Sequence, residues 1–379
     1  MAVNKVEING VVKLDLTADT VTAAKLAQGE TAHDASGKRI TGTMHVVQLQ
    51  LIVTVSAGAT VTATKGSLSV SGTSVNGTCT LTVPEAGTWS VSATLDGQTS
   101  DTKSVSITGS YAVALSFISS ILNDNEWSVI KSVSDAGQGE NYWSIGDRKE
   151  VTLNGTVGHL SLSNYTTYAF IIGFNHNQEL EGVNRIHFQL AKTALSGGTD
   201  VCFCDDSYGM NVPKTGHFFS MNSSRTNSGG WERSQMRTNI CGTSLSSYSG
   251  TIIAVIPEAL RAVLKSVTKY TDNTGGNSSA ARNVTATTDY FFLLSEYEVF
   301  GSISNANRNE SSKQAQYAYY SAGNSKVKYR HDRTSTPVEW LLRSPYASRT
   351  TAFVIVYTNG LVSGTEAYNS RGFTPGFCV

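Results

Sequence analysis

Two segments near the end of the chain carry side chains that suit the recognition of a glycan or a protein. They are residues 346–351 and 366–371, and both mix tyrosine and arginine with small polar residues. Tyrosine gives a large contact area at a low cost in conformational entropy, and the small polar residues adapt their hydrogen bonds to a ligand. The alternative is that both segments are ordinary solvated loops. The predicted binding residues are Tyr346, Ser348, Arg349, Thr350, Tyr368, Asn369, Ser370 and Arg371.

Residues that could catalyse a reaction or bind a metal are present, but they lack the spacing that such sites need. The seven histidines form no HxH or HExxH pattern, and the sequence has no nucleophile elbow and no phosphate loop. A glycosidase needs two carboxylates ~5 to 9 Å apart across a sugar cleft. Nothing in the sequence sets such a pair among the candidates Asp205, Asp206, Glu296, Glu298 and Glu366.

Asp205 and Asp206 could also bind calcium, but no EF-hand loop surrounds them. The five cysteines are an odd set without paired CxxC spacing: Cys79, Cys202, Cys204, Cys241 and Cys378. We expect them to be reduced, buried thiols. The sequence thus predicts a protein that is not an enzyme, with no catalytic residues, no cofactor and no metal.

The charge balance argues against two classes of partner. Lys+Arg and Asp+Glu are equal at 29 each, so there is no electrostatic reason to expect nucleic acid or an anionic membrane. The longest apolar runs fall short of the ~20 residues of a membrane span. The N-terminal stretch "MAVNKVEING" lacks the apolar segment of a secretion signal. We therefore expect no membrane insertion, and synthesis in a cytoplasm.

The elements that must hold the predicted binding residues lie on either side of them. "WLLRSP", residues 340–345, reads as a strand that ends at Pro345, since proline cannot donate to a sheet. Arg343 beside an apolar strand needs a partner, for which Glu296 and Glu298 are the candidates. Phe373 and Phe377 are expected to pin the end of the chain into a core. The two loops would then sit on a rigid base.

Three units are predicted along the chain. Residues 1–46 contain a hairpin around Asn9-Gly10, a short helix within 17–29 and a return through Ser36-Gly37. This unit is too small to hold a core alone, so we expect it to pack on copies of itself or on a partner. Residues 47–109 carry short alternating strands at regular spacing, which indicates a small β-sandwich with Trp89 in its core.

Residues 110–379 form the third unit, with mixed helices and strands. We expect a helix within 111–125, a hairpin around Gly146-Asp147, and apolar strands within 168–177 and 185–191. Residues 256–270, "IPEALRAVLKSVTKY", show the clearest helical spacing. Residues 289–301 are a buried strand that passes into a helix, where Ser295 and Glu298 have the spacing of a capping box.

Each unit resembles a known kind of module. "GETAHDASGKRITGTM" resembles a short module of bacteriophage tail and tail-fibre proteins, and residues 47–109 resemble immunoglobulin-like spacers. The ordered motifs "YWSIGDRKEVTLNG", "GGWERSQMR", "IPEALRAVLKSVTK", "DYFFLLSEYEVFG", "WLLRSP" and "GFTPGFCV" resemble an uncharacterised domain family of phage tail proteins and bacterial surface proteins. That family is related to the C-type-lectin-like fold of formylglycine-generating enzymes.

These resemblances imply a multidomain, mainly β protein: a small N-terminal attachment unit, an Ig-like sandwich and an α+β C-type-lectin-like domain. They imply a phage tail-fibre receptor-binding protein, located in the virion, whose N-terminus attaches to other tail or baseplate proteins. The C-terminal loops would bind a bacterial surface glycan or protein. Phage fibres gain avidity from several copies, so a homotrimer is expected.

The chain departs from the related families in two respects. The active-site cysteine pair of formylglycine-generating enzymes is not matched, because Cys378 stands alone. The calcium motifs Glu-Pro-Asn and Trp-Asn-Asp of sugar-binding C-type lectins are also absent. The alternatives to a receptor-binding protein are a tail-associated glycan depolymerase and a prophage or bacterial surface adhesin.

Overall fold

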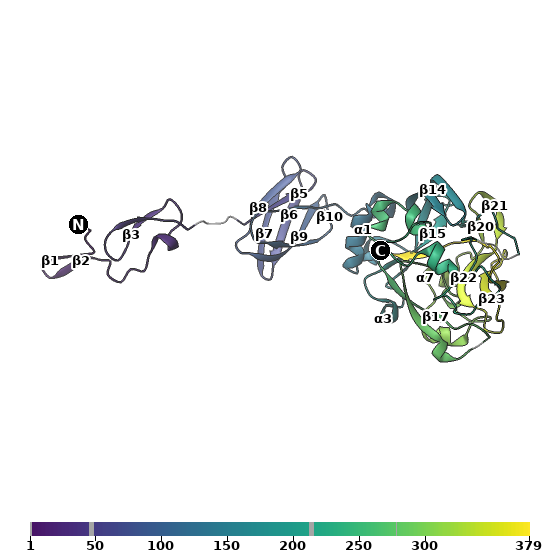
Figure 1. Ribbon diagram of the computed structural model, residues 1–379. Helices are drawn as coiled ribbons and strands as arrows, with labels where there is room; N and C mark the ends of the chain where they lie inside the picture. The colour runs from purple at the N-terminus through teal and green to yellow at the C-terminus, as the bar shows by residue number, and fades with distance from the viewer. Residues whose placement is uncertain (1, 45–48, 212–215, 278) are drawn as a thin grey trace. The chain divides into compact units, whose positions relative to one another are not determined.

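The chain divides into two compact units, residues 1–117 and 118–379, which are described separately. The computed structural model describes residues 2–44, 49–211, 216–277 and 279–379 (Figure 1). Its strands form several small sheets, and the molecule is mainly β. Among the described residues, none of the helices combines the length and the apolar character that a membrane crossing requires.

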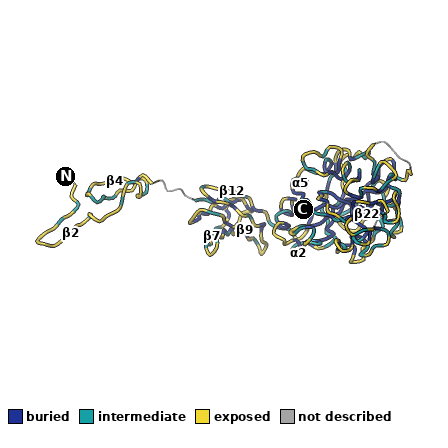
Figure 2. The backbone as a smooth tube through the Cα atoms, turned by 60° about the horizontal axis from the view of Figure 1, so that its bottom comes forward, coloured by how far each residue is buried: buried dark blue, intermediate teal, exposed yellow. Residues whose placement is uncertain are grey.

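Residues 2–44 form two hairpins with almost no buried surface. Strands β1 (Lys5–Ile8) and β2 (Val11–Asp15) pair through a turn in which Asn9 and Gly10 have φ of +52° and +72°, so this predicted hairpin is confirmed. Strands β3 (Thr31–His33) and β4 (Arg39–Thr41) pair across the predicted return. The helix expected within 17–29 is wrong, since only a 3-10 turn, Ala23–Lys25, forms there. Gly42 is the one buried residue among the described residues 2–44. Figure 2 shows that most of this stretch is exposed.

Residues 49–117 fold as two sheets that share one core. One sheet has the order β12-β5-β8, with β5 at Gln50–Thr54, β8 at Thr78–Thr82 and β12 at Tyr111–Ala114. The other has the order β10-β9-β6-β7, with β11 also paired to β9. Its strands are β6 (Thr60–Lys65), β7 (Leu68–Thr73), β9 (Gly87–Leu95), β10 (Gln98–Thr99) and β11 (Lys103–Ile107). Trp89 is fully buried between the sheets, as predicted.

The helix expected within 111–125 is wrong, because strand β12 and a 3-10 turn at Leu122–Asp124 form there. Residues 111–114 are strand β12, which pairs in parallel with β5 from Tyr111 opposite Leu51 to Ala114 opposite Thr54. Val113 and Leu115 face the core of the two sheets while Ala112 and Ala114 are exposed, which is the period of a strand. The helical spacing of Leu115, Ile118 and Leu122 therefore joined residues of two different units.

The central sheet of the larger unit has five antiparallel strands in the order β13-β14-β15-β25-β19. The strands are β13 (Arg148–Val157), β14 (Leu160–Phe174), β15 (Ile186–Lys192), β25 (Gly376–Cys378) and β19 (Phe291–Phe292). The hairpin expected around Gly146-Asp147 is wrong, because β13 begins at Arg148 and turns back at Gly158 into β14. The strands expected within 168–177 and 185–191 are confirmed. Phe373 and Phe377 are fully buried, as expected.

The long helix expected over 256–270 is wrong. Two short helices, α4 (Ile252–Val255) and α5 (Glu258–Arg261), precede strand β17 (Val267–Asp272), which pairs with β18 (Val284–Asp289). Val267, Lys269 and Thr271 of β17 are all buried, so burial alternates with a period of two. The ion partners of Lys269 are distant in the sequence, and they favour a strand where local spacing favours a helix.

Strands β22 (Trp340–Pro345), β23 (Ala352–Val356) and β24 (Val362–Glu366) form a separate antiparallel sheet, and β22 ends at Pro345 as predicted. Helix α6 (Glu296–Phe300) begins with the predicted capping box of Ser295 and Glu298. The remaining elements are α1 (Trp127–Asp135), α2 (Gly139–Tyr142), α3 (Gln178–Glu181), α7 (Ala318–Ser321), β16 (Val201–Cys202), β20 (Lys328–Arg330), β21 (Arg333–Val338), the π-helix Met236–Cys241, and 3-10 turns at Leu122–Asp124, Ala281–Asn283 and Arg308–Ser312.

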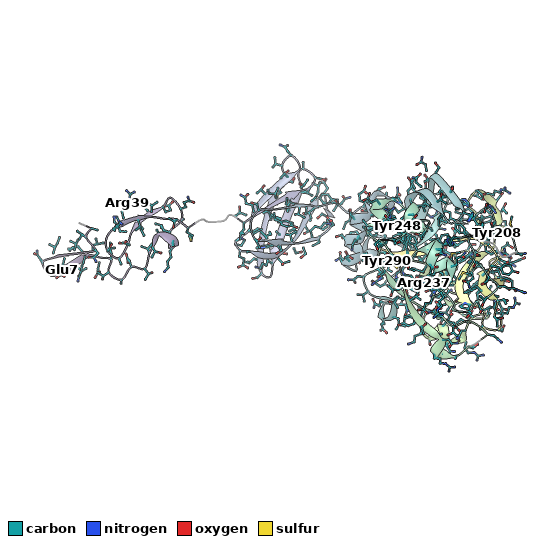
Figure 3. The ribbon with its side chains drawn as sticks, viewed as in Figure 1. Glu7, Arg39, Tyr208, Arg237, Tyr248 and Tyr290 are labelled. Carbon is teal, nitrogen blue, oxygen red and sulfur yellow. The ribbon has the colours of Figure 1, made fainter. Side chains whose placement is uncertain are left out.

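Asp289 ties the segment before the π-helix to strand β18. Trp231 is fully buried, and its Nε1 donates to Asp289 Oδ2 at 3.0 Å. Arg237, labelled in Figure 3, donates from Nε to Asp289 Oδ1 at 2.6 Å. Trp231 thus anchors this segment in the core.

Candidate functional site

A polar depression of about 600 Å³ opens beside the loop that joins β22 to β23. This loop, residues 346–351, is the first of the two segments predicted to bind a ligand. The depression also takes in segment 303–308 and the residues on either side of position 278. Its polar lining residues are Asn277, Ser279, Ser304, Asn305, Arg308 and Ser348.

Asn227 fixes the shape of loop 346–351 from beneath. Its Nδ2 donates to the carbonyl oxygens of Tyr346, Arg349 and Ala352 at 3.2, 2.7 and 3.0 Å. Its backbone N–H donates to the carbonyl of Thr350 at 2.9 Å. Asn227 is fully buried, so no water competes for these bonds. The side chains of the loop therefore start from a backbone with one fixed course.

The same asparagine reaches a second wall of the depression. Asn227 Oδ1 accepts from the backbone N–H of Gly276 at 2.8 Å. Asp272 Oδ1 accepts from the N–H groups of Thr274 and Gly275 at 3.0 Å each. The stretch that leads to Asn277 is thus held against loop 346–351.

Glu296 holds the third wall, segment 304–306. Its carboxylate accepts from the backbone N–H groups of Ser304, Asn305 and Ala306, the shortest of these bonds being 2.6 Å. Burial raises the pKa of Glu296, and the three N–H groups oppose that effect. Asn305 in turn accepts from the N–H of Ala347 at 2.8 Å. This bond closes the third wall onto loop 346–351.

The predicted residues of loop 346–351 lie at the surface. Ser348, Arg349 and Thr350 are exposed and Tyr346 is half-buried. The guanidinium of Arg349 lies over the Tyr346 ring, 4.6 Å from its centroid. Ser348 lines the depression itself.

The expectation that the second segment is an exposed loop is wrong for three of its four predicted residues. Asn369, Ser370 and Arg371 are buried, with 6%, 3% and 8% of their surface exposed, and only Tyr368 is half-exposed. Ser370 Oγ donates to Asp205 Oδ1 at 2.8 Å, and Arg371 forms an ion pair with Glu339. Both partners are distant in the sequence, so local composition could not reveal them.

The carboxylates considered for glycoside hydrolysis are all engaged, and even exposed Asp206 accepts from Ser207 Oγ at 3.2 Å. Asp205 accepts from the N–H of Phe219 at 2.6 Å as well as from Ser370. Glu366 pairs with Arg225 at 2.9 Å. Glu296 caps its backbone segment, and Glu298 is in the core. In these contacts the carboxylates hold backbone segments and side chains in place.

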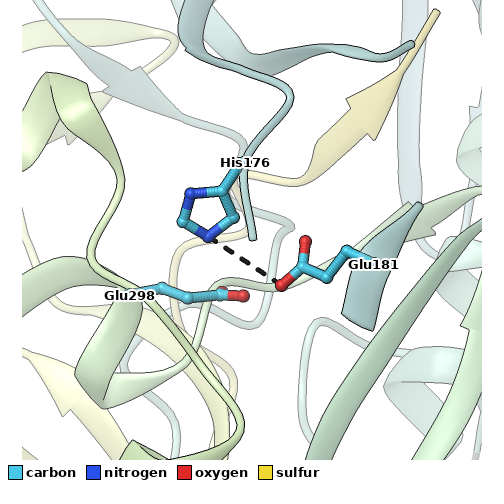
Figure 4. Close-up of side chains that lie close together, drawn as sticks. All are labelled: His176, Glu181 and Glu298. Atoms are coloured by element: carbon cyan, nitrogen blue, oxygen red, sulfur yellow. Dashed lines mark ion pairs between the residues drawn. The ribbon is translucent and has the colours of Figure 1, made fainter. Parts of the chain in front are cut away.

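A charged cluster in the core includes the residue types of a metal site. The ligand atoms of His176, Glu181 and Glu298 lie within 4.8 Å of one another (Figure 4). The Lys269 ammonium already occupies the position that a metal ion would take, because its Nζ lies 2.6 Å from Glu181 Oε2 and 3.0 Å from Glu298 Oε1. The donor set does not fit a metal, since the ammonium would have to leave first.

Arg343 completes this cluster. It donates to Glu298 from Nη1 and Nη2, and to Thr271 Oγ1 from Nε at 2.8 Å. Glu298 is thus the partner of Arg343, and the alternative, Glu296, is not. Burial alone would raise the pKa of Glu298, but Arg343 and Lys269 lower it well below its usual range. Sequence reasoning missed Lys269 and Glu181, because it placed Lys269 on a helix.

His176 is the neutral member of the cluster. Burial and the nearby Lys269 lower the pKa of His176 to about 3. Its ring stacks on Tyr317, with the centroids 3.8 Å apart. The cluster is therefore a structural support.

Comparison with known families covers the part of the chain that builds the depression. No curated protein matches the chain. Residues 216–379 match the model of a family described as a domain of unknown function (DUF6273). This stretch contains Asn227, Glu296 and loop 346–351.

Proposed function

We propose that the chain is a bacteriophage tail receptor-binding protein that binds a bacterial surface glycan or protein at the polar depression. The observation that carries the proposal is the depression itself, whose three walls are fixed by Asn227 and Glu296. Preformed backbone reduces the conformational entropy lost on binding. Serine, asparagine, arginine and tyrosine at its edge supply hydrogen bonds and a flat surface for a sugar ring or a peptide.

The binding residues in this proposal are those that reach the surface around the depression. They are Tyr346, Ser348, Arg349 and Thr350 of the loop, together with Asn277, Ser279 and Arg308 of the other walls. Asn369, Ser370 and Arg371 are proposed as supports, because each is buried. The larger unit would have the C-type-lectin-like fold, and residues 49–117 would be an Ig-like spacer.

The N-terminal hairpins are proposed to attach the chain to other tail or baseplate proteins. Four apolar side chains of this small segment are 41–54% exposed: Ile8, Val11, Val12 and Leu14. Exposed apolar surface of this kind is typical of an interaction site. Burial of this surface in a homotrimer or against a tail protein would give the hairpins the core they lack. Light scattering after size-exclusion chromatography checks the trimer, and a monomer would count against it.

The binding proposal is tested with the labelled full-length chain and host cells. We expect Ser348→Asp combined with Arg349→Ala to reduce cell binding about tenfold or more. The double substitution places a carboxylate in the lining of the depression and removes a guanidinium donor beside it. The control is Arg233→Ala, since Arg233 is also exposed and does not line the depression. Equal binding by both variants would reject the depression as the receptor site.

The proposal is one of binding without hydrolysis. We expect no new reducing ends after the chain is incubated with host wall or capsular polysaccharide. Release of reducing ends would favour the depolymerase instead.

A further inference from the structure

A second depression, of about 710 Å³, is lined by two basic side chains and one acidic side chain. Arg148 at the start of β13, Lys192 at the end of β15 and Asp200 line it. Lys328 of β20 lies behind, with Nζ 3.9 Å from Asp200 Oδ2. Two lysines thus lie against one carboxylate, and Arg148 lines the same depression.

The two lysines are held in the protein and away from bulk water. Lys192 is 5% exposed and Lys328 is fully buried. Lys192 Nζ pairs with Asp200 and donates to Tyr319 Oη at 2.9 Å. Lys328 Nζ is buried without a hydrogen-bond partner, and it lies over the rings of Phe170 and Trp340. A buried ammonium with no acceptor is costly, so an additional anion nearby would be stabilising.

Arg148 has donors left for a ligand. Its Nη1 donates to the carbonyls of Ala194 and Gly197 at 2.6 Å each, which holds the loop 193–199 against β13. Within the described ranges, its Nε and Nη2 have no acceptor. The guanidinium is therefore positioned by its own loop while part of its fork remains available.

The titration of Lys192 agrees with this excess of positive charge. Burial, together with Lys328 and Arg148, lowers the pKa of Lys192 to about 8, against the opposing effect of Asp200. Asp200 therefore offsets only part of the combined effect of burial and the two neighbouring cations on the pKa of Lys192. A bound anion would lower the cost of keeping Lys192 protonated.

We propose that this depression binds an anionic group, a carboxylate or a phosphate, through Arg148 and Lys192. The Tyr319 hydroxyl accepts from Lys192, and Gly197, Gly198 and Thr199 also line the depression. The site does not depend on the receptor-binding role of the first depression, because it uses other residues.

The full-length chain is titrated with inorganic phosphate and, separately, with glucuronate, and binding is followed by calorimetry. Saturable binding of phosphate assigns the site to a phosphate-bearing ligand, and saturable binding of glucuronate assigns it to an acidic sugar. Either result supports the proposal. Glucose, which has the ring but no charge, should not bind. Absence of binding by both anions overturns the proposal.

Two variants separate this site from a purely structural ion pair. Arg148→Gln keeps an amide that can donate to the loop carbonyls but removes the charge, and we expect about tenfold weaker anion binding. Asp200→Asn removes the competing carboxylate, and we expect tighter binding. Weaker binding by Asp200→Asn, or unchanged binding by Arg148→Gln, contradicts the proposal. Arg233→Gln is the control, and near-ultraviolet circular dichroism checks that each variant is folded.

Discussion

The buried charges of Lys269, Glu298 and Arg343 connect three elements, one of which leads into loop 346–351. Lys269 lies on β17, Glu298 on α6 and Arg343 on β22, three residues before Tyr346. Each charge is fully buried and each has a partner of opposite sign. Such a network costs much desolvation and adds little stability over an apolar core, but the loss of one member leaves a buried charge unpaired.

We therefore expect Lys269→Met to lower the free energy of unfolding by about 3–5 kcal/mol, because Glu181 and Glu298 would face each other without the ammonium. Urea unfolding followed by tryptophan fluorescence measures this loss. Lys313→Met is the control, because Lys313 is exposed, and it should change stability by no more than about 0.5 kcal/mol. A loss below about 1 kcal/mol for Lys269→Met would contradict the role given to the cluster.

His176 makes stability depend on pH. The pKa of His176 is lowered from 6.5 to about 3 in the folded chain, so between these values the unfolded chain binds the additional proton. The contribution of His176 to stability is therefore present above pH 6.5 and is lost as the pH falls toward 3, by up to about 1.4 kcal/mol per pH unit.

His176→Phe keeps a ring on Tyr317 and removes this titration. As the pH is lowered from 6.5 toward 3, the unfolding free energy of the wild type should decrease relative to that of the variant. The comparison isolates His176 from Glu181, whose raised pKa has the opposite effect on stability. The same substitution at exposed His217 is the control, and parallel curves for wild type and His176→Phe would refute the assignment.

At the scale of elements, loop 346–351 depends on contacts that come from outside its own sheet. Strands β22 and β23 set where the loop begins and ends, but Asn227 sets its course between them. Glu296 of α6 does the same for the facing wall. The depression therefore belongs to several elements at once, and Asn227 contacts two of its walls.

Asn227→Ala should lower stability by about 1–3 kcal/mol, because the carbonyls of Tyr346, Arg349 and Ala352 lose their donor. Amide hydrogen exchange in residues 346–352 should become faster, and cell binding should weaken. Asn359→Ala in the β23–β24 turn is the control, since Asn359 is exposed. Unchanged exchange in the loop of Asn227→Ala would contradict this account.

Local patterns in the sequence predict those elements whose partners are close in the chain. The Asn9-Gly10 hairpin and the Ser295–Glu298 capping box are examples, because a few adjacent residues contain all the interactions. The end of strand β22 at Pro345 is predictable because proline has no backbone N–H to donate to a sheet.

Elements that depend on distant partners were mispredicted. The spacing of residues 267–272 favours a helix, but they form a strand. They pair with β18, and Lys269 forms ion pairs with Glu181 and Glu298, which are distant in the sequence. Ser370 and Arg371 are buried because Asp205 and Glu339 lie opposite. The depression itself draws on segments near residues 227, 277, 305 and 348, and only the last was a predicted binding segment. No local pattern links these four positions.

At the scale of the whole molecule, each compact core keeps its thiols out of water. All five cysteines are free and buried, in the core of the two N-terminal sheets or in the larger unit. Burial raises the pKa of each of these thiols, which lowers their reactivity. Both features follow from the packing of the units and not from any local motif.

The native chain should therefore show no rapidly reacting thiol toward an aromatic disulfide reagent at pH 8, and all five should react after unfolding in guanidinium chloride. The absorbance of the released thiolate measures both states. The reagent's full reaction with free glutathione under the same conditions is the control. One rapidly labelled cysteine in the native chain would show that a unit opens locally.

Strand β25 lies between β15 and β19, although residues 376–378 come long after both in the sequence. During translation, β13, β14 and β15 leave the ribosome well before the strand that must cover the open edge of β15. That edge can meanwhile pair with another nascent chain on the same messenger RNA. Ribosome spacing and holding chaperones should therefore decide how much of this protein reaches its native form.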